Sequence, residues 1–231
     1  MRKNRRRNLL AASALICLSW PAVAQSNQFL PEIDLYSKVR SGVRFQFQAK
    51  QTREANQPVQ AEIGPSIEIY THPLRGLADV AKFDLDDAKA RALVLAFGYR
   101  YLPEANGGAA TNRLEPVATV RFPFTRKLAL SDRNRFDLDW KSHGFTWRYR
   151  NKFQVESPLK IRSYHLSPYA AAELFYESQY GKIADTALYA GCILPIKKHL
   201  QLDPYYEHQN ETGKKPNDQL DQAGIILNLF F

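Results

Sequence analysis

The chain has 231 residues, enough for one domain with a complete core or for one closed barrel. Its formal net charge is +9, but five of its 32 Lys and Arg residues lie within the first seven positions. Subtracting them leaves 27 basic against 23 acidic residues, a net charge of +4 with both signs interspersed. This balance argues against a nucleic-acid-binding surface.

The first 24 residues have the three parts of a secretory signal peptide. A basic start (Arg2, Lys3 and Arg5–Arg7) precedes the apolar stretch Leu9–Leu18 and the small-x-small cleavage site Ala22-Val23-Ala24. The apolar stretch is shorter than the about 20 residues of a spanning helix, which argues against an uncleaved anchor. We therefore expect cleavage after Ala24 and a single mature domain over residues 25–231.

Cysteine and histidine usage limits the chemistry of the mature domain. Cys17 lies in the signal segment, and the large Ile16 before it does not suit a lipoprotein cleavage site. Cleavage leaves Cys192 alone, so no internal disulfide is expected. The five histidines have neither the i, i+2 strand spacing nor the i, i+4 helix spacing of a ligand set, and we expect no metal and no cofactor.

From Phe29 onward, apolar and polar residues alternate in segments of about ten, the pattern of strands with one apolar face. In chain order, the segments predicted as strands are 29–38, 43–50, 62–69, 93–101, 114–122, 128–141, 144–156, 164–176, 184–194, 200–207 and 223–231. A twelfth, weaker segment is Gly76–Leu85. The longest apolar run, Ala92–Tyr99, is too short for a spanning helix.

The clearest pair of strands lies on either side of Ser142-His143, which we predict to form a two-residue turn. Such a turn pairs Lys141 with Gly144, so that Trp140 faces Phe145 and Asp137 faces Arg148. Both apolar rows then share one face and both charged rows share the other. Register and pattern therefore agree on a hairpin.

The last predicted strand has apolar residues at every second position and stops on an aromatic residue. These residues are Ala223, Ile225, Leu227, Leu229 and Phe231. The ending resembles the C-terminal strand by which outer-membrane barrels are recognised by the barrel-assembly machinery.

Signal segment, repeated alternation and final strand together predict an all-β fold, an antiparallel transmembrane β-barrel of about twelve strands with ten as the alternative. Bacterial barrels of this class have an even number of strands, both termini on the periplasmic side, short periplasmic turns and longer outer loops. We therefore expect the outer membrane of a Gram-negative bacterium as the location, with membrane lipid and the assembly machinery as partners. A soluble periplasmic β-barrel that binds a ligand is the alternative.

Short motifs in the C-terminal half carry a family resemblance. In order, they are Arg148-Tyr149-Arg150-Asn151, Pro158-Leu159, Pro168-Tyr169, Glu173, Phe175-Tyr176, Tyr189-Ala190-Gly191, Pro195 and Tyr206-x-x-Gln209. This order resembles the domain-of-unknown-function family 2490 of small bacterial outer-membrane barrels. The resemblance implies a barrel without an assigned biochemical role, and it transfers no catalytic residue.

In a membrane barrel the polar face lines the lumen, and the predicted hairpin concentrates charge there. The cluster consists of Arg133, Arg135, Asp137, Asp139, Arg148, Arg150 and Lys152. A closed structural barrel filled by charge pairs is one interpretation. A narrow passive pore that favours small anionic solutes is the other, with Arg135 and Arg150 side by side at its constriction.

A lipid-modifying hydrolase is a further alternative. His165 and Ser167 share one face of a predicted strand, and Glu173 could orient the histidine. Some outer-membrane lipid A deacylases have a similar His-x-Ser step, typically followed by Asn, where this chain has Pro168. The predicted register points His165 into the lumen, away from lipid, so we expect no catalysis.

Overall fold

The computed structural model describes residues 26–104, 109–125, 127–142, 144–213, 215 and 217–231. The predicted signal peptide lies outside the described residues. The strands are β1 (Ser26–Arg40), β2 (Val43–Glu54), β3 (Gln57–Tyr70), β4 (Leu93–Leu102), β5 (Thr111–Thr125), β6 (Leu128–Lys141), β7 (Gly144–Glu156), β8 (Leu159–Ile161), β9 (Tyr164–Glu177), β10 (Lys182–Lys197), β11 (Leu200–Glu211) and β12 (Asp218–Phe230). Two short helices, α2 (Arg75–Val80) and η1 (Asp87–Ala90), lie between β3 and β4.

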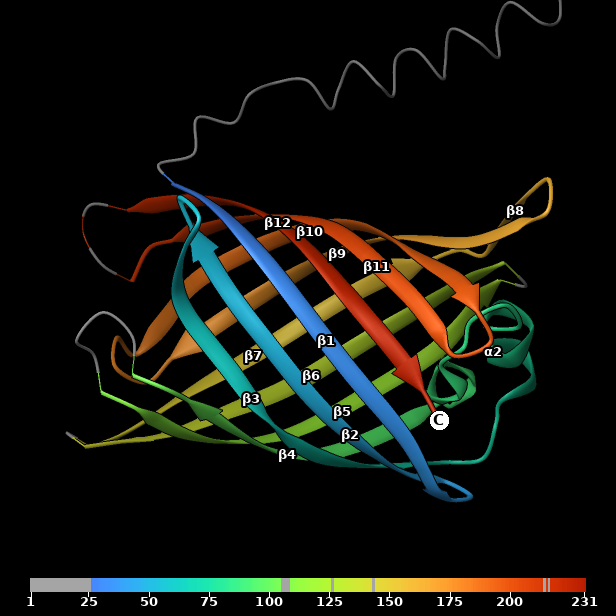
Figure 1. Cartoon of the computed structure of the whole chain (residues 1–231), viewed down its shortest axis with the longest axis horizontal. Coiled ribbons are helices and arrows are strands. Elements are labelled where there is room, and N and C mark those ends of the chain that lie inside the picture. The colour runs from blue at the N-terminus through green and yellow to red at the C-terminus, as the bar shows by residue number, and fades with distance from the viewer. Residues whose placement is uncertain (1–25, 105–108, 126, 143, 214, 216) are drawn as a thin grey trace, which may run out of the picture.

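The strands close into a barrel, which confirms the all-β prediction (Figure 1). Neighbours along the chain pair antiparallel, β7 pairs with β9, and β9 pairs with β10. The wall therefore has eleven strands, and the three-residue β8 is a twelfth that extends the sheet along β9 at one end. No helix among the described residues is long and apolar enough to cross a membrane.

The ring closes through a parallel pair, because an odd number of strands cannot all alternate in direction. Ser26 of β1 lies opposite Leu220 of β12, and Tyr36 lies opposite Phe230. Strand β1 therefore begins at the end of the barrel opposite to Phe230. The predicted count of about twelve strands is confirmed by the eleven wall strands and β8, but the expectation that an even number of wall strands places both chain ends on one side is wrong.

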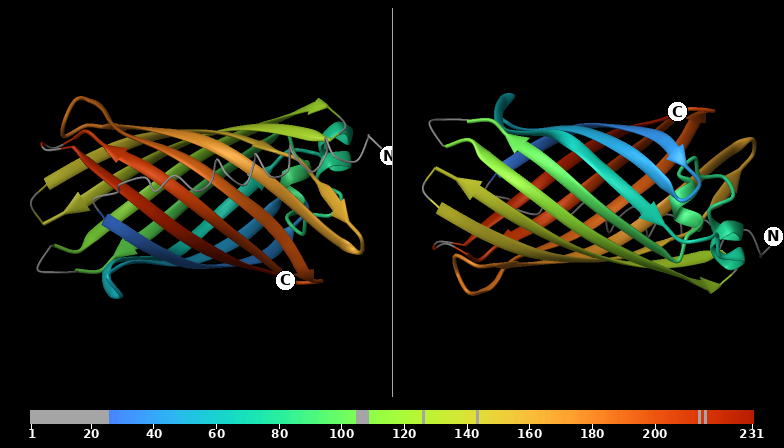
Figure 2. Two further views of the ribbon diagram at one scale, coloured as in Figure 1. Left: turned by 90° about the horizontal axis from the view of Figure 1, so that it is seen from above. Right: turned by 90° about the horizontal axis from the view of Figure 1, so that it is seen from below.

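The predicted strand over Gly76–Leu85 is also wrong, because this stretch contains helix α2. Leu77 and Val80 are three residues apart, and both are buried in one cluster with Ala129 of β6. A period of three to four residues lets a helix bury one side, which a strand cannot do with this spacing. The connection from Thr71 to Ala92 is the longest of the described part, and it lies at the same end as Phe231, not at the opposite end as predicted for a long loop (Figures 1 and 2).

The hairpin of β6 and β7 has the predicted register. Lys141 pairs with Gly144, Trp140 with Phe145, and Asp137 with Arg148. Because side chains alternate along each strand, this register turns the aromatic rows outward and the charged rows into the lumen. The same alternation in the other strands gives the barrel an apolar outer wall and a polar interior.

A polar cluster on β6 and β7 interrupts the apolar outer wall. Asp132 and Asn134 of β6 and Asn151 of β7 lie on the outer row, where the Asn151 amide donates to Asp132 at 2.6 Å and to Asn134 at 3.1 Å. The Tyr149 hydroxyl donates to Asn134 as well. These groups hydrogen-bond one another, which lowers the cost of placing them outside the polar lumen.

Candidate functional site

The lumen is lined by charged side chains along its length. It contains a cavity of about 570 Å³ that extends from Gln28 and Gln209 near one end to Asp86 and Lys89 at the other. The charged residues predicted on the β6–β7 hairpin are brought together here, with Arg133 opposite Lys152 and Arg135 opposite Arg150. Among the described residues, no group of three or more His, Cys, Asp or Glu side chains is arranged to hold a metal ion.

Asp137 lies at the centre of the largest ionic network and is 0% exposed. It accepts hydrogen bonds from Arg135 and from Arg148, whose Nε lies 3.3 Å from Oδ2, and Arg113 lies 3.9 Å away. A carboxylate without access to water needs such partners, because the desolvation of a lone charge is very costly. Asp137 therefore joins β5, β6 and β7 through the lumen.

Further ion pairs connect this centre to neighbouring strands. Arg113 of β5 donates two hydrogen bonds to Asp139, of 2.6 and 2.9 Å, and its Nη1 lies 3.2 Å from Glu62 of β3. Glu115 accepts from Arg135 and lies 3.5 Å from Arg100. Forked arginine–carboxylate contacts of this kind hold the two side chains in one orientation and also neutralise their charges.

Arg150 belongs to a second network on the β7, β9, β10 and β11 side. Its Nε donates to Glu173 at 2.8 Å, and the Tyr189 hydroxyl lies 2.7 Å from Glu173 and 2.8 Å from Glu207. Arg135 and Arg150 are thus side by side as predicted, but both are neutralised by carboxylates. Arg133 and Lys152 form the next inward-facing pair of the hairpin, and they have no carboxylate within 4 Å in the described part of the chain.

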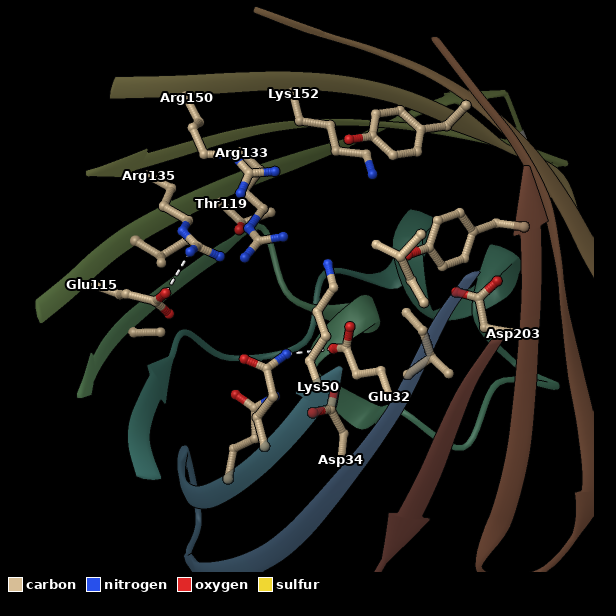
Figure 3. A pocket seen from close by; sticks show the side chains of 18 of the residues that line it. Glu32, Asp34, Lys50, Glu115, Thr119, Arg133, Arg135, Arg150, Lys152 and Asp203 are labelled. Carbon is tan, nitrogen blue, oxygen red and sulfur yellow. Dashed lines mark hydrogen bonds and ion pairs between the residues drawn. The ribbon is translucent and has the colours of Figure 1, made fainter. Parts of the chain in front are cut away.

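The opposite wall carries carboxylates whose contacts are with neutral groups. Glu32 accepts from Gln48, Asp34 accepts from Tyr36, and Asp203 accepts from Tyr169. Figure 3 shows these acids across the cavity from the cations of β6 and β7. Sequence reasoning overlooked Glu32 and Asp34, although their alternation with Ile33 and Leu35 was the signal that places them in the lumen.

The connection between β3 and β4, residues 71–92, lies across one mouth of the barrel; we call it the mouth segment. Its contacts reach strands around the ring. Arg44 of β2 donates to Asp86 at 2.5 Å, Lys89 lies 3.1 Å from Glu156 of β7, and Gln201 of β11 accepts from the Leu85 amide at 3.2 Å. The sequence predicted a strand here, so it did not predict that this mouth is covered.

Two carboxyl groups of the mouth segment have shifted pKa values. Burial by itself would raise the pKa of Asp86, but the guanidinium of Arg44 outweighs burial and lowers the pKa to about 2. Burial raises the pKa of Asp84 above its ordinary value, although the Lys89 ammonium 2.8 Å away opposes this shift. Of these two carboxyl groups, Asp86 keeps its negative charge to lower pH.

The residues considered for hydrolysis do not come together. His165 stacks on Phe83 of the mouth segment with ring centroids 3.6 Å apart, and its Nε2 is buried without a hydrogen-bond partner in the described structure. Glu173 is eight residues further along β9, about 26 Å away at the usual rise of a strand. Glu173 therefore cannot orient His165, and the three residues considered for hydrolysis do not form a triad.

The final strand β12 has the predicted outward row. Ala223 and Ile225 are exposed, whereas Gln222, Gly224 and Asn228 between and beyond them are directed into the lumen and buried.

Comparison with known protein families shows to which family this chain belongs. The family described as "Protein of unknown function (DUF2490)" matches residues 89–220, more than half of the chain. The chain belongs to this family. The match runs from the mouth segment into β12 and includes the whole charged hairpin, in agreement with the resemblance seen in the C-terminal half. No curated protein matches the chain.

The structure explains why several residues of the motifs behind this resemblance occur together. Arg150, Glu173 and Tyr189 form one hydrogen-bonded group in the lumen. Tyr169 lies opposite Gly191, and a side chain at Gly191 would collide with the Tyr169 ring. The family pattern therefore corresponds in part to packing and charge pairing inside the barrel.

Proposed function

We propose that the mature chain is an outer-membrane β-barrel that forms a narrow passive pore with a preference for small anions. The observation that carries this proposal is the apolar outer wall. Large apolar side chains are exposed on the outward rows of most strands, among them Phe29, Ile33, Ile67, Phe97, Val120, Phe136, Phe153, Leu174, Leu188 and Ile225. Such a surface is costly in water and favourable in lipid. The signal peptide predicted over residues 1–24 supports export to the cell envelope.

The lumen supports the pore. A continuous cavity runs along it, and among the described residues four cations that line it form no ion pair within 4 Å: Lys50, Arg121, Arg133 and Lys152. The ion-paired network and the mouth segment narrow the path, so only small solutes would pass. The barrel-assembly machinery, through β12, and membrane lipid are the partners we propose.

The pore is tested by single-channel recording from the refolded chain in a planar bilayer under a salt gradient. We expect small discrete steps and a reversal potential that indicates anion preference. Barrels that insert without conducting would reject the pore and favour a structural role. A preference for cations would contradict the proposal that Lys50, Arg133 and Lys152 select the ions.

The membrane location has its own test in the outward side chain Phe97, which is 58% exposed in β4. Phe97→Arg should destabilise the barrel in lipid vesicles by about 2–4 kcal/mol, because a charge at mid-membrane must leave water. Unfolding in urea is monitored by the difference in electrophoretic mobility between unheated and boiled samples.

The control for this variant is Leu159→Arg, an equally drastic change on β8, which lies outside the barrel wall and is 45% exposed. This control should unfold like the unmodified chain. A soluble periplasmic barrel would tolerate both substitutions and would appear in the periplasmic fraction, and that result would sink the membrane proposal.

A further inference from the structure

We infer that the lumen contains a binding site for a phosphate group, formed by Lys50 of β2, Arg133 of β6 and Lys152 of β7. This inference deepens the proposed anion pore, on which it rests for the route of access, by naming the class of anion. All three side chains line the central cavity.

The register places the three cations around one space. Arg133 and Lys152 are cross-strand partners on the inward rows of β6 and β7. In Figure 3, Lys50 extends from the other side of the lumen toward Lys152 and Arg133. Ladder hydrogen bonds hold Arg133 and Lys152 side by side, and Lys50 lines the same cavity from β2.

These cations differ from most other lumen arginines in having no carboxylate within 4 Å among the described residues; Arg121 also has none, but it donates to the Ala88 carbonyl instead. Within the described residues, Arg44, Arg100, Arg113, Arg135, Arg148 and Arg150 each lie within 4 Å of a carboxylate. No hydrogen bond or ion pair is formed by Arg133, Lys152 or Lys50 in that part of the chain. The Lys152 ammonium instead lies 3.5 Å from the centroid of the Tyr189 ring.

Carboxylates lie near the group, but among the described residues none forms an ion pair with it within 4 Å: Glu173 is the cross-strand partner of Lys152 on β9, and Glu32 lines the same cavity as Lys50. Glu173 accepts from Arg150, Glu115 accepts from Arg135, and Glu32 accepts from Gln48. Three positive charges that face one partly desolvated space repel one another. An anion bound between them would replace this repulsion with three charge-assisted contacts.

The donor set suits a phosphate group better than chloride or a single carboxylate. A guanidinium offers a planar fork, and two ammonium groups act as point charges from other directions, which together match the several oxygens of a tetrahedral dianion. Thr119, the partner of Arg133 on β5, adds a hydroxyl on the same inward row. The acids Glu32 and Asp203 across the cavity would disfavour a large polyanion.

The site is tested by isothermal titration of inorganic phosphate into the refolded chain in detergent at low ionic strength. We expect saturable binding that sodium chloride at equal ionic strength does not reproduce. Arg133→Gln and Lys152→Gln should each weaken binding by about tenfold, the loss of one charge-assisted contact.

The matched control is Arg121→Gln, which removes the same charge from the lumen at a side chain that donates to the Ala88 carbonyl at 3.3 Å. It should bind phosphate like the unmodified chain. The shift between unheated and boiled samples shows that each variant is folded. A titration with glycerol 3-phosphate distinguishes a site for a phosphorylated solute, which would bind more tightly, from a site for free phosphate.

Equal binding by all variants, or no binding of either compound, would overturn the site. The two proposals fail separately. Phosphate binding without conductance leaves the site in place and rejects the pore. Anion conductance without phosphate binding leaves the pore in place and rejects the site.

Discussion

Replacing Asp137 by alanine is expected to lower the free energy of unfolding by about 3–5 kcal/mol, the largest effect of any single lumen substitution. The carboxylate is fully buried and holds Arg135 and Arg148, with Arg113 at 3.9 Å. Its removal leaves these guanidinium groups facing one another in a space with little water. The measurement is urea unfolding in lipid vesicles, followed by the fluorescence of Trp140 and Trp147.

Two further variants sharpen this test. Asp137→Asn keeps the shape of the side chain and should lose nearly as much stability, because the charge is what the arginines require. Glu104→Ala removes an exposed carboxylate between β4 and β5 and should change stability by less than about 0.5 kcal/mol. If Asp137→Ala unfolded at the same urea concentration as Glu104→Ala, the ionic network would not stabilise the barrel.

Releasing the mouth segment is expected to raise the conductance of the pore several-fold. Asp86→Asn combined with Lys89→Gln removes the ion pairs with Arg44 and Glu156. The segment then keeps only the apolar packing of α2 and weaker contacts, so it spends more time away from the mouth. Single-channel steps of the double variant, recorded beside those of the unmodified chain, measure the change.

The control removes the same two charges elsewhere in the segment. Asp79→Asn with Lys82→Gln changes an exposed carboxylate and a lysine that rests on Phe83, and neither pairs with the barrel wall. Its conductance should stay at the original level. A closed pore in the Asp86 and Lys89 double variant would show that the segment is not what restricts the path.

Acid provides a second route to the same opening. The pKa of Asp86 is about 2 in the folded chain, below its ordinary value of 3.8, so its ionic contact stabilises the closed segment above that ordinary value. This contribution is lost as the pH falls from about 4 toward 2. The raised pKa of Asp84 acts in the opposite sense, because its protonated form is the one that burial favours. Conductance should therefore rise at acid pH in the unmodified chain and change less in Asp86→Asn.

The sequence alone determined the eleven strands of the wall and which face of each is polar. Strict alternation around Trp140 and Phe145 leaves only one register that puts both apolar rows together, since a shift by one residue would invert every side chain. That register in turn places Arg133 beside Lys152 and Arg135 beside Arg150. The charged lining of the lumen and the outward row of β12 follow from the same alternation. The family was indicated by a different signal, the order of short motifs in the C-terminal half.

Only the tertiary structure decided how the ring closes and which charges are left without partners. The parallel pairing of β1 with β12 joins residues about 190 positions apart, and strand alternation carries no signal for it. The fold of residues 71–92 depends on packing of Leu77 and Val80 against β6, a contact made only once the barrel exists. Whether a cation of the lumen forms an ion pair depends on carboxylates from other strands. Glu173 of β9 lies opposite Lys152 in register, yet its ion pair is with Arg150.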